Sequence, residues 1–83
     1  MLMENQTFRI ADIYVPAHRR RSLDPATVNE IAESMLEEGQ RTPILVRPDG
    51  ARFVLVEGFH RLEACKSLGE DTIVGLVVQA RKR

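Results

Sequence analysis

The clearest periodic pattern in the chain lies between Asp24 and Gly39. Apolar side chains recur there at the three- and four-residue spacings of a helix with one buried face. These positions are Val28, Ile31, Ala32, Met35 and Leu36. Asp24 suits the N-cap, Pro25 the first helical position and Gly39 the stop, so we predict a helix over residues 25–38. The acidic side chains on its solvent side are Glu30, Glu33, Glu37 and Glu38.

Almost unbroken apolar runs mark the second half of the chain. Residues 43–47 and 52–57 predict two strands, and Pro48-Asp49-Gly50-Ala51 between them has the composition of a hairpin turn. Residues 72–78 form another such run, which predicts a last buried strand.

The remaining segments give weaker signals. Residues 8–15 are rich in β-forming residues, so we expect a strand or extended segment, and residues 17–23 lack a clean period, so we expect a loop. Residues 59–68 predict a second helix with Gly69 as its stop. Its apolar side carries Leu62, Cys65 and Leu68. The order predicts one α+β domain over residues 1–83, with a mixed sheet, two main helices and a mobile basic tail at residues 80–83.

Composition narrows the class of protein. With 83 residues, 43% hydrophobic and 29% charged, the chain has room for one globular domain and does not resemble a disordered protein. No apolar run approaches the ~18 residues of a membrane span, and the N-terminus lacks the order of a signal peptide. The single cysteine, Cys65, excludes an internal disulfide framework and fits a reducing cytosol, so we expect a cytoplasmic protein.

The net charge is zero, but its distribution is uneven. Residues 1–23 hold four arginines against two acids, residues 24–38 hold five acids and no base, and residues 39–83 hold eight bases against five acids. The acidic block should face solvent or basic groups, and DNA should avoid it.

The strand-glycine-helix junction at Gly58 is the most informative site for chemistry. The first amides of a helix lack internal partners and carry partial positive charge, and a glycine allows an anion to approach them closely. His60 and Arg61 would add two donors beside those amides, and Arg61 can grip a phosphate with two parallel bonds. The alternative is a plain tight turn in which Arg61 pairs with an acid such as Glu57.

Three motifs, taken together and in this order, resemble the ParB/sulfiredoxin superfamily over roughly residues 10–79. They are the capped helix start Ser22-Leu23-Asp24-Pro25, the strand Thr42-Pro43-Ile44-Leu45-Val46-Arg47 and the helix start Gly58-Phe59-His60-Arg61-Leu62-Glu63-Ala64. The resemblance implies that the third motif binds the phosphates of a nucleoside triphosphate, CTP or ATP, with or without Mg²⁺.

The third motif departs from both branches of the superfamily. Partition proteins carry Gly-Glu-Arg-Arg and use CTP, whereas sulfiredoxin carries Gly-Cys-His-Arg and holds ATP. Gly58, His60 and Arg61 fit the sulfiredoxin form, but Phe59 replaces the catalytic cysteine, so we expect no sulfiredoxin activity. Cys65 is expected to be a small buried hydrophobe rather than a substitute nucleophile.

The resemblance adds candidates outside the third motif. The further nucleotide-binding candidates are Thr42, Arg47, Thr27 and Ser34. Thr27 and Ser34 could donate hydroxyl bonds, whereas Glu30 nearby would repel phosphate unless a metal lay between them. Arg19, Arg20 and Arg21 either contact nucleotide or DNA phosphate or form a solvated basic loop. Arg47 is about as well explained as a surface charge, and we expect His18 to be a surface residue.

The favoured function is a nucleotide-binding module in DNA partition or in plasmid- or phage-related regulation. Its partners would be the nucleotide and either DNA, through backbone contacts, or another protein, and the hairpin could pair across a dimer axis or be covered by the helices. The alternative is a small ATP- or ADP-dependent phosphotransferase related to sulfiredoxin or free-serine kinase, with Glu57 or Glu30 as the acid near the motif. We favour the module without catalysis, or with slow hydrolysis at most.

Overall fold

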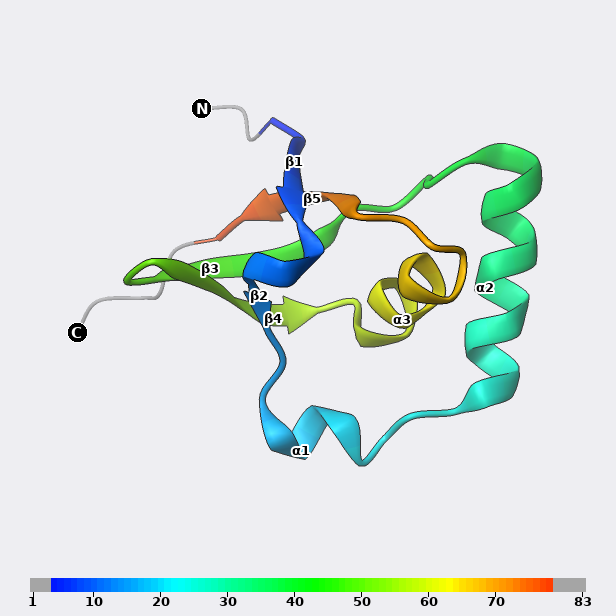
Figure 1. Cartoon of the computed structure of the whole chain (residues 1–83), viewed down its shortest axis with the longest axis horizontal. Coiled ribbons are helices and arrows are strands. Elements are labelled where there is room, and N and C mark those ends of the chain that lie inside the picture. Colours follow the sequence, from blue (N-terminus) through cyan, green and yellow to red (C-terminus); the bar gives the residue numbers. More distant parts are fainter. Residues whose placement is uncertain (1–3, 79–83) are drawn as a thin grey trace.

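The computed structural model describes residues 4–78, which form a five-stranded mixed sheet with three helices (Figure 1). The elements are β1 (Gln6–Arg9), the 3-10 helix η1 (Ile10–Asp12), β2 (Ile13–Tyr14), α1 (Ala17–Arg20), α2 (Pro25–Glu38), β3 (Ile44–Asp49), β4 (Arg52–Glu57), α3 (Phe59–Ser67) and β5 (Thr72–Val77). The predicted α+β class is confirmed, as are the helix after Asp24, the hairpin and the last strand. The second helix ends at Ser67, one residue before the predicted end.

The N-terminal prediction was wrong in detail. In place of one strand over residues 8–15, the chain forms two short strands on opposite edges of the sheet, whose order is β1-β5-β3-β4-β2. β1 pairs antiparallel with β5, and β2 pairs parallel with β4. The change of edge occurs within η1, a single turn of 3-10 helix.

This change of edge is possible because the sheet is curled. The ring of Phe8 in β1 packs edge-on against the ring of Phe53 in β4, with centroids 4.9 Å apart, although β5 and β3 separate these strands in the sheet. The inside of the curl holds the core, and its fully buried side chains include Ile44, Val46, Leu62, Cys65 and Ile73. α3 packs into this core, and α2 packs on α3 (Figure 1).

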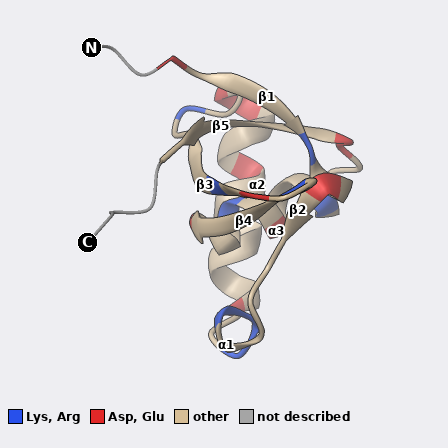
Figure 2. Ribbon diagram, turned by 90° about the vertical axis from the view of Figure 1, so that its left-hand side faces the viewer, with Lys and Arg blue, Asp and Glu red and all other residues tan. Residues whose placement is uncertain are grey.

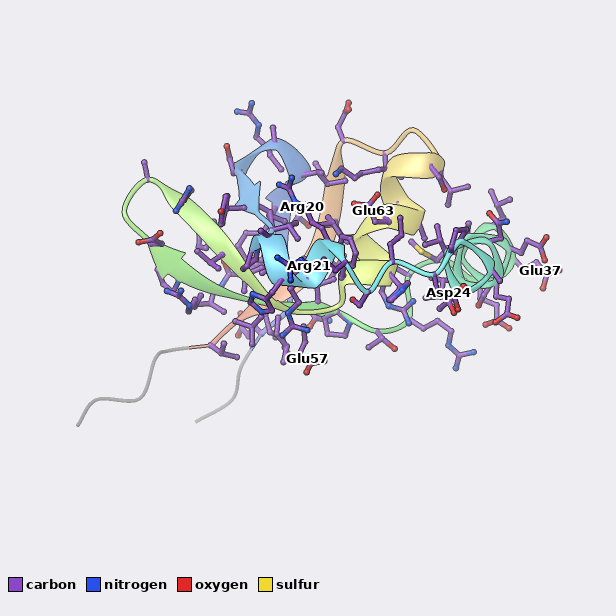
Figure 3. The ribbon with its side chains drawn as sticks, turned by 90° about the horizontal axis from the view of Figure 1, so that it is seen from below. Arg20, Arg21, Asp24, Glu37, Glu57 and Glu63 are labelled. Atoms are coloured by element: carbon purple, nitrogen blue, oxygen red, sulfur yellow. The ribbon has the colours of Figure 1, made fainter. Side chains whose placement is uncertain are left out.

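Two other predictions need correction. The segment predicted as a loop at residues 17–23 begins with α1, which is one helical turn long. Leu36, assigned to the apolar stripe of α2, is 73% exposed, because only Val28 and Ala32 of that stripe are buried against α3. The acidic side chains of α2 face solvent as predicted, and Figure 3 shows Glu37 pointing away from the rest of the molecule.

Charge is segregated along the fold. The charged residues of α1 are arginines, whereas those of α2 are glutamates (Figure 2). The predicted basic tail at residues 80–83 lies outside the described part of the chain. Between residues 4 and 78, no helix is both long and apolar enough to cross a membrane.

Candidate functional site

The turn between β4 and α3 requires a glycine. Gly58 is the N-cap of α3 and has φ +108° and ψ 30°, in the left-handed region that side chains disfavour. A Cβ atom there would lie 2.7 Å from Cγ2 and 3.3 Å from Cα of Ile44, which is itself completely buried in β3. Both the backbone angle and the close approach of β3 therefore exclude larger residues.

The N-terminus of α3 has no cap of its own. No side chain among residues 4–78 bonds to it, and the amide of Leu62 makes the bond back to the carbonyl of Gly58 at 2.9 Å. The amides of residues 59–61 thus have no partner inside the helix, and the helix dipole adds positive potential at this end. The geometry suits an anion.

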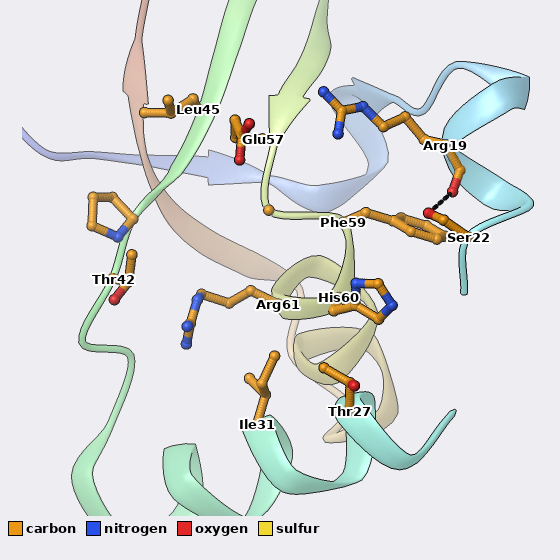
Figure 4. A pocket seen from close by; sticks show the side chains of 12 residues that line it. Arg19, Ser22, Thr27, Ile31, Thr42, Leu45, Glu57, Phe59, His60 and Arg61 are labelled. Atoms are coloured by element: carbon orange, nitrogen blue, oxygen red, sulfur yellow. Dashed lines mark hydrogen bonds between the residues drawn. The ribbon is translucent and has the colours of Figure 1, made fainter. Parts of the chain in front are cut away.

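A pocket of about 610 Å³ opens at this end of α3, and we call it the α3 pocket (Figure 4). Arg19 and Ser22 line it from the α1 side, Ile31 from α2, and Leu45 and Glu57 from the sheet. Six of the predicted nucleotide-binding residues also line it: Thr27, Thr42, Gly58, Phe59, His60 and Arg61. The phenyl ring of Phe59 is only 7% exposed and belongs to the core, so that residue offers mainly its backbone to the pocket.

Four predicted residues lie outside the α3 pocket. Arg47 is exposed in β3 and Ser34 is exposed on α2. Arg20 borders a separate, smaller cavity with Leu23, and Arg21 is exposed (Figure 3). Glu30, which we expected to repel phosphate, is also exposed and does not line the pocket.

Arg61 is the cation aimed into the pocket. Figure 4 shows its side chain extending from α3 into the space in front of Thr42. The residue as a whole is partly buried, and its guanidinium makes neither a hydrogen bond nor an ion pair with any residue between 4 and 78. The alternative pairing with Glu57 is therefore absent from this part of the chain, and the donors of Arg61 face the pocket.

His60 has a structural bond in addition to its predicted place at the pocket. Its Nε2 accepts a hydrogen bond from the backbone N–H of Asp24 at 3.0 Å, which leaves Nδ1 as the donor nitrogen of the neutral ring. Its ring also packs edge-on against Phe59, with centroids 5.7 Å apart. The imidazole thereby ties the start of α3 to the N-cap residue of α2.

Asp24 caps α2 as predicted. Its carboxylate accepts bonds from the amide of Ala26 at 3.2 Å and from the hydroxyl of Thr27 at 2.8 Å. The bond from Thr27 is the largest cause that lowers the pKa of Asp24. It outweighs the opposing effect of burial, and the Ala26 amide and the nearby His60 lower the pKa by smaller amounts. Because the Thr27 hydroxyl proton is directed to Asp24, it is not aimed at a pocket ligand.

Arg19 differs from the two arginines that follow it. It donates from Nη2 to the backbone carbonyl of Val56, near the end of β4, and the Ser22 hydroxyl donates to the carbonyl of Arg19 at 2.8 Å. The bond to Val56 joins α1 to the end of β4 beside the α3 pocket. The sequence offered no signal to separate Arg19 from Arg20 and Arg21, since all three lie in a run without periodicity.

The apolar wall of the pocket was not predicted, although the sequence holds part of the signal for it. Ile31 lies one turn after Thr27 on α2 and so faces the same way, a spacing that could have identified it. Leu45 alternates with buried Ile44 and Val46, so its side chain lies on the opposite face of β3, where it lines the pocket. The pairing of β3 with β4 is irregular at this point, because Val56 of β4 is left without a partner between Leu55 and Glu57.

The donor set of the pocket fits an anion better than a bare cation. Among residues 4–78, no three His, Cys, Asp or Glu side chains gather closely enough to hold a metal ion. Cys65 lies buried in the core as predicted, and desolvation, with a smaller effect of Glu70, raises the pKa of its thiol. The thiol is therefore held in its neutral form, away from pocket chemistry.

Comparison with known proteins identifies the fold and its relatives. The profile of the ParB N-terminal domain matches residues 3–83. A probable chromosome-partitioning protein ParB from Pseudomonas putida is 39% identical over 59 residues, which are 70% of this chain and 20% of that protein. The chain thus spans about a fifth of the length of such curated relatives.

Two solved structures share the architecture. Sulfiredoxin from Arabidopsis thaliana superposes with a TM-score of 0.84 at 28% identity, covering 93% of this chain and 86% of its own. The C-terminally truncated chromosome-partitioning protein ParB from Caulobacter crescentus, complexed with CTP-γ-S, gives a TM-score of 0.80 at 24% identity, covering 95% of this chain and 46% of its own.

Proposed function

The chain belongs to the ParB N-terminal domain family, and from that membership we propose that its α3 pocket binds the phosphates of a nucleoside triphosphate. The bound nucleotide would act as a signal in DNA partition or in related plasmid or phage regulation. A ParB relative of the same fold has been solved with a CTP analogue, which supports CTP as the first nucleotide to test.

One observation carries the proposal. The uncapped amides of α3 and the guanidinium of Arg61 face one pocket of about 610 Å³, and no carboxylate between residues 4 and 78 neutralises that guanidinium. Charge-assisted bonds from a guanidinium and from helix amides are those that phosphate oxygens accept best.

Each side of the pocket has a part in binding. The amides of residues 59–61 and Arg61 would bind phosphate oxygens, while Ile31, Pro43 and Leu45 offer an apolar wall to the base or sugar. Arg19 supplies a second cation on the α1 side, held in place by its bond to Val56. A triphosphate often arrives with Mg²⁺, and Glu57 is the carboxylate that lines this pocket and could hold the ion together with phosphate oxygens.

Glu57 also favours the second candidate, phosphotransfer. A phosphotransferase needs a base near the acceptor, and Glu57 is exposed at the pocket wall. One carboxylate without a positioned partner is a weaker basis than the complete phosphate-binding end of α3, so we propose the binding module first.

A thermal-shift titration tests both candidates. CTP, ATP, GTP and ADP are each titrated with and without Mg²⁺, because a ligand that binds only the folded state raises the melting temperature by mass action. Selectivity for CTP supports the partition-like module, and selectivity for ADP or ATP supports phosphotransfer. No shift with any of the four contradicts the proposal.

Arg61→Ala is the decisive variant, with Arg20→Ala as its matched control outside the pocket. Loss of a bond between charged groups costs about 1.5–3 kcal/mol, so we expect Arg61→Ala to weaken binding by roughly 10- to 100-fold. Arg20→Ala should change it much less. Equal binding by Arg61→Ala and the wild type would show that the site is misplaced.

A further inference from the structure

Gln40 stands out among the side chains outside the phosphate-binding end of α3. Its amide makes three hydrogen bonds: Nε2 donates to the carbonyls of Thr42 at 2.9 Å and Val74 at 2.8 Å, and Oε1 accepts from the N–H of Val74 at 2.8 Å. Both N–H groups and the oxygen of the side chain are therefore used. The two bonds with Val74 form the reciprocal N–H···O pattern that a neighbouring peptide would make.

The side chain lies beside Val74 on the edge of β5 that faces β3, at a point where β3 does not yet pair with β5. Pairing of β3 with β5 begins at Ile44, which lies opposite Gly75. Val74 precedes Gly75 in β5 and pairs with Thr7 of β1 on its other side. Gln40 thus supplies, from its side chain, the polar partner that β3 does not yet provide at Val74.

The same amide holds the segment that leads into the α3 pocket. Residues 40–43 lie between α2 and β3 and belong to no helix or strand. The bond from Gln40 to the carbonyl of Thr42 fixes this connection, and both Thr42 and Pro43 line the pocket on the side toward which Arg61 extends (Figure 4).

We propose that Gln40 is a positioning residue of the α3 pocket, whose side-chain amide anchors the wall of Thr42 and Pro43 to β5 and so sets its separation from Arg61. This inference rests on the proposed function, because it assigns the wall a part in binding the triphosphate. The requirement is chemical: the position needs two donors and one acceptor, which a glutamine side chain supplies and neither glutamate nor methionine does.

Two substitutions with side chains about as long as glutamine separate the contribution of the donor bonds from that of the acceptor bond. In Gln40→Glu the carboxylate still accepts from the Val74 N–H but faces the carbonyl oxygens of Thr42 and Val74, with no proton to donate. In Gln40→Met all three bonds are lost without a change in charge. Protonation of the introduced carboxylate at low pH restores one donor, which gives the experiment a reversible control.

The experiment measures CTP binding, or binding of whichever nucleotide gives the largest thermal shift, at pH 7.5 and pH 4.0 for the wild type and both variants. We expect each variant to bind roughly tenfold more weakly than the wild type at pH 7.5. At pH 4.0, below the ordinary glutamate pKa of about 4.3, Gln40→Glu should regain part of the wild-type affinity measured at that pH, whereas Gln40→Met should remain weak. Wild-type affinity in Gln40→Met at both values of pH would overturn the inference, because charge alone would then explain Gln40→Glu.

Amide hydrogen exchange provides a readout that needs no nucleotide. The Val74 N–H should exchange slowly in the wild type and in Gln40→Glu, and faster in Gln40→Met. Slow exchange of Val74 in Gln40→Met overturns the anchoring role whether or not nucleotide binds. If the wild type binds no nucleotide while Val74 behaves as expected, the proposed function fails and the anchoring of the wall is supported on its own.

Discussion

The two main helices begin beside the same pocket, but their N-termini are built in opposite ways. α2 starts with Pro25, which has no N–H, and its next amide is capped by the Asp24 carboxylate. α3 starts after Gly58, without a side-chain cap from the described part of the chain and with Arg61 in its first turn. The carboxylate of Asp24 neutralises the first end, whereas the second is left open in the way that suits an anion.

This difference shows that the N-terminus of a helix stays open to an anion where the chain places no acidic side chain beside it. The acidic residues are concentrated at Asp24 and along α2, and none of these lines the α3 pocket. His60 joins the two ends, since it lies in the first turn of α3 and accepts the N–H of Asp24. Substitutions at the N-terminus of α2 or of α3 can therefore test whether the two ends act independently.

The largest effect is expected for Gly58→Ala, which alters the open end. The added Cβ would meet Ile44 at 2.7 Å while φ is held at +108°, so strain and overpacking should together lower the free energy of unfolding by about 2–4 kcal/mol. Urea unfolding monitored by circular dichroism measures the loss.

Gly69→Ala is the matched control for that substitution. Gly69 also has a positive φ, +78°, but a Cβ there would have nothing within 4 Å. It should therefore cost only the backbone strain, about 1–2 kcal/mol. If the two variants lose equal stability, the close approach of Ile44 to the turn has no energetic importance.

A smaller effect is expected for His60→Leu, which breaks the link between the two ends. The Asp24 N–H loses its acceptor, but water can reach that group, so we expect the free energy of unfolding to fall by about 0.5–1.5 kcal/mol. Chemical denaturation checks this value. His60→Gln, whose side-chain oxygen can accept the bond, should be closer to the wild type, and a larger loss for His60→Gln than for His60→Leu would argue against the link.

The smallest effect is expected for Asp24→Asn, which removes the charge of the closed end and keeps an acceptor for the Ala26 amide. The folded protein lowers the pKa of Asp24, chiefly through the Thr27 hydroxyl, so the ionised carboxylate stabilises the fold at neutral pH. That contribution is present above the ordinary pKa of 3.8 and is lost as the pH falls through the lowered value.

Melting temperatures of the wild type and Asp24→Asn, measured from pH 7 to pH 2, test whether the Asp24 carboxylate stabilises the fold at neutral pH and ceases to do so in acid. The wild type should melt slightly higher at neutral pH, and the two curves should converge in acid. Glu33→Gln, on the exposed face of α2, is the control and should follow the wild type throughout. A gap that widens toward low pH would contradict the assigned role of Asp24.

The sequence predicted best those features whose causes are local. Asp24, Pro25 and Gly39 specify α2 through neighbouring residues alone, and the succession of strand, Gly58 and helix located the open end of α3. The exposure of Leu36 was not predictable in this way, because it depends on how far α3 reaches along α2 rather than on the period of the stripe.

Features that depend on distant partners were missed. The two N-terminal strands are defined by pairing of Phe8 with Ile73 and of Ile13 with Phe53, which no local pattern reveals. The same holds for Gln40, whose polar side chain would suit any loop, since its partner Val74 lies far along the chain. Whether the predicted site residues bind a nucleotide stays a prediction, to be tested through Arg61.

The placement of β1 and β2 on opposite edges has a consequence for how the molecule is assembled. β1 cannot form its ladder until β5, the last strand of this sheet in chain order, is present. Closing such long loops early is entropically unfavourable, so the N-terminal segment should be among the last to dock in refolding and should slow the overall rate. A growing chain would therefore carry β1 without its pairing partner until residues 72–77 had left the ribosome.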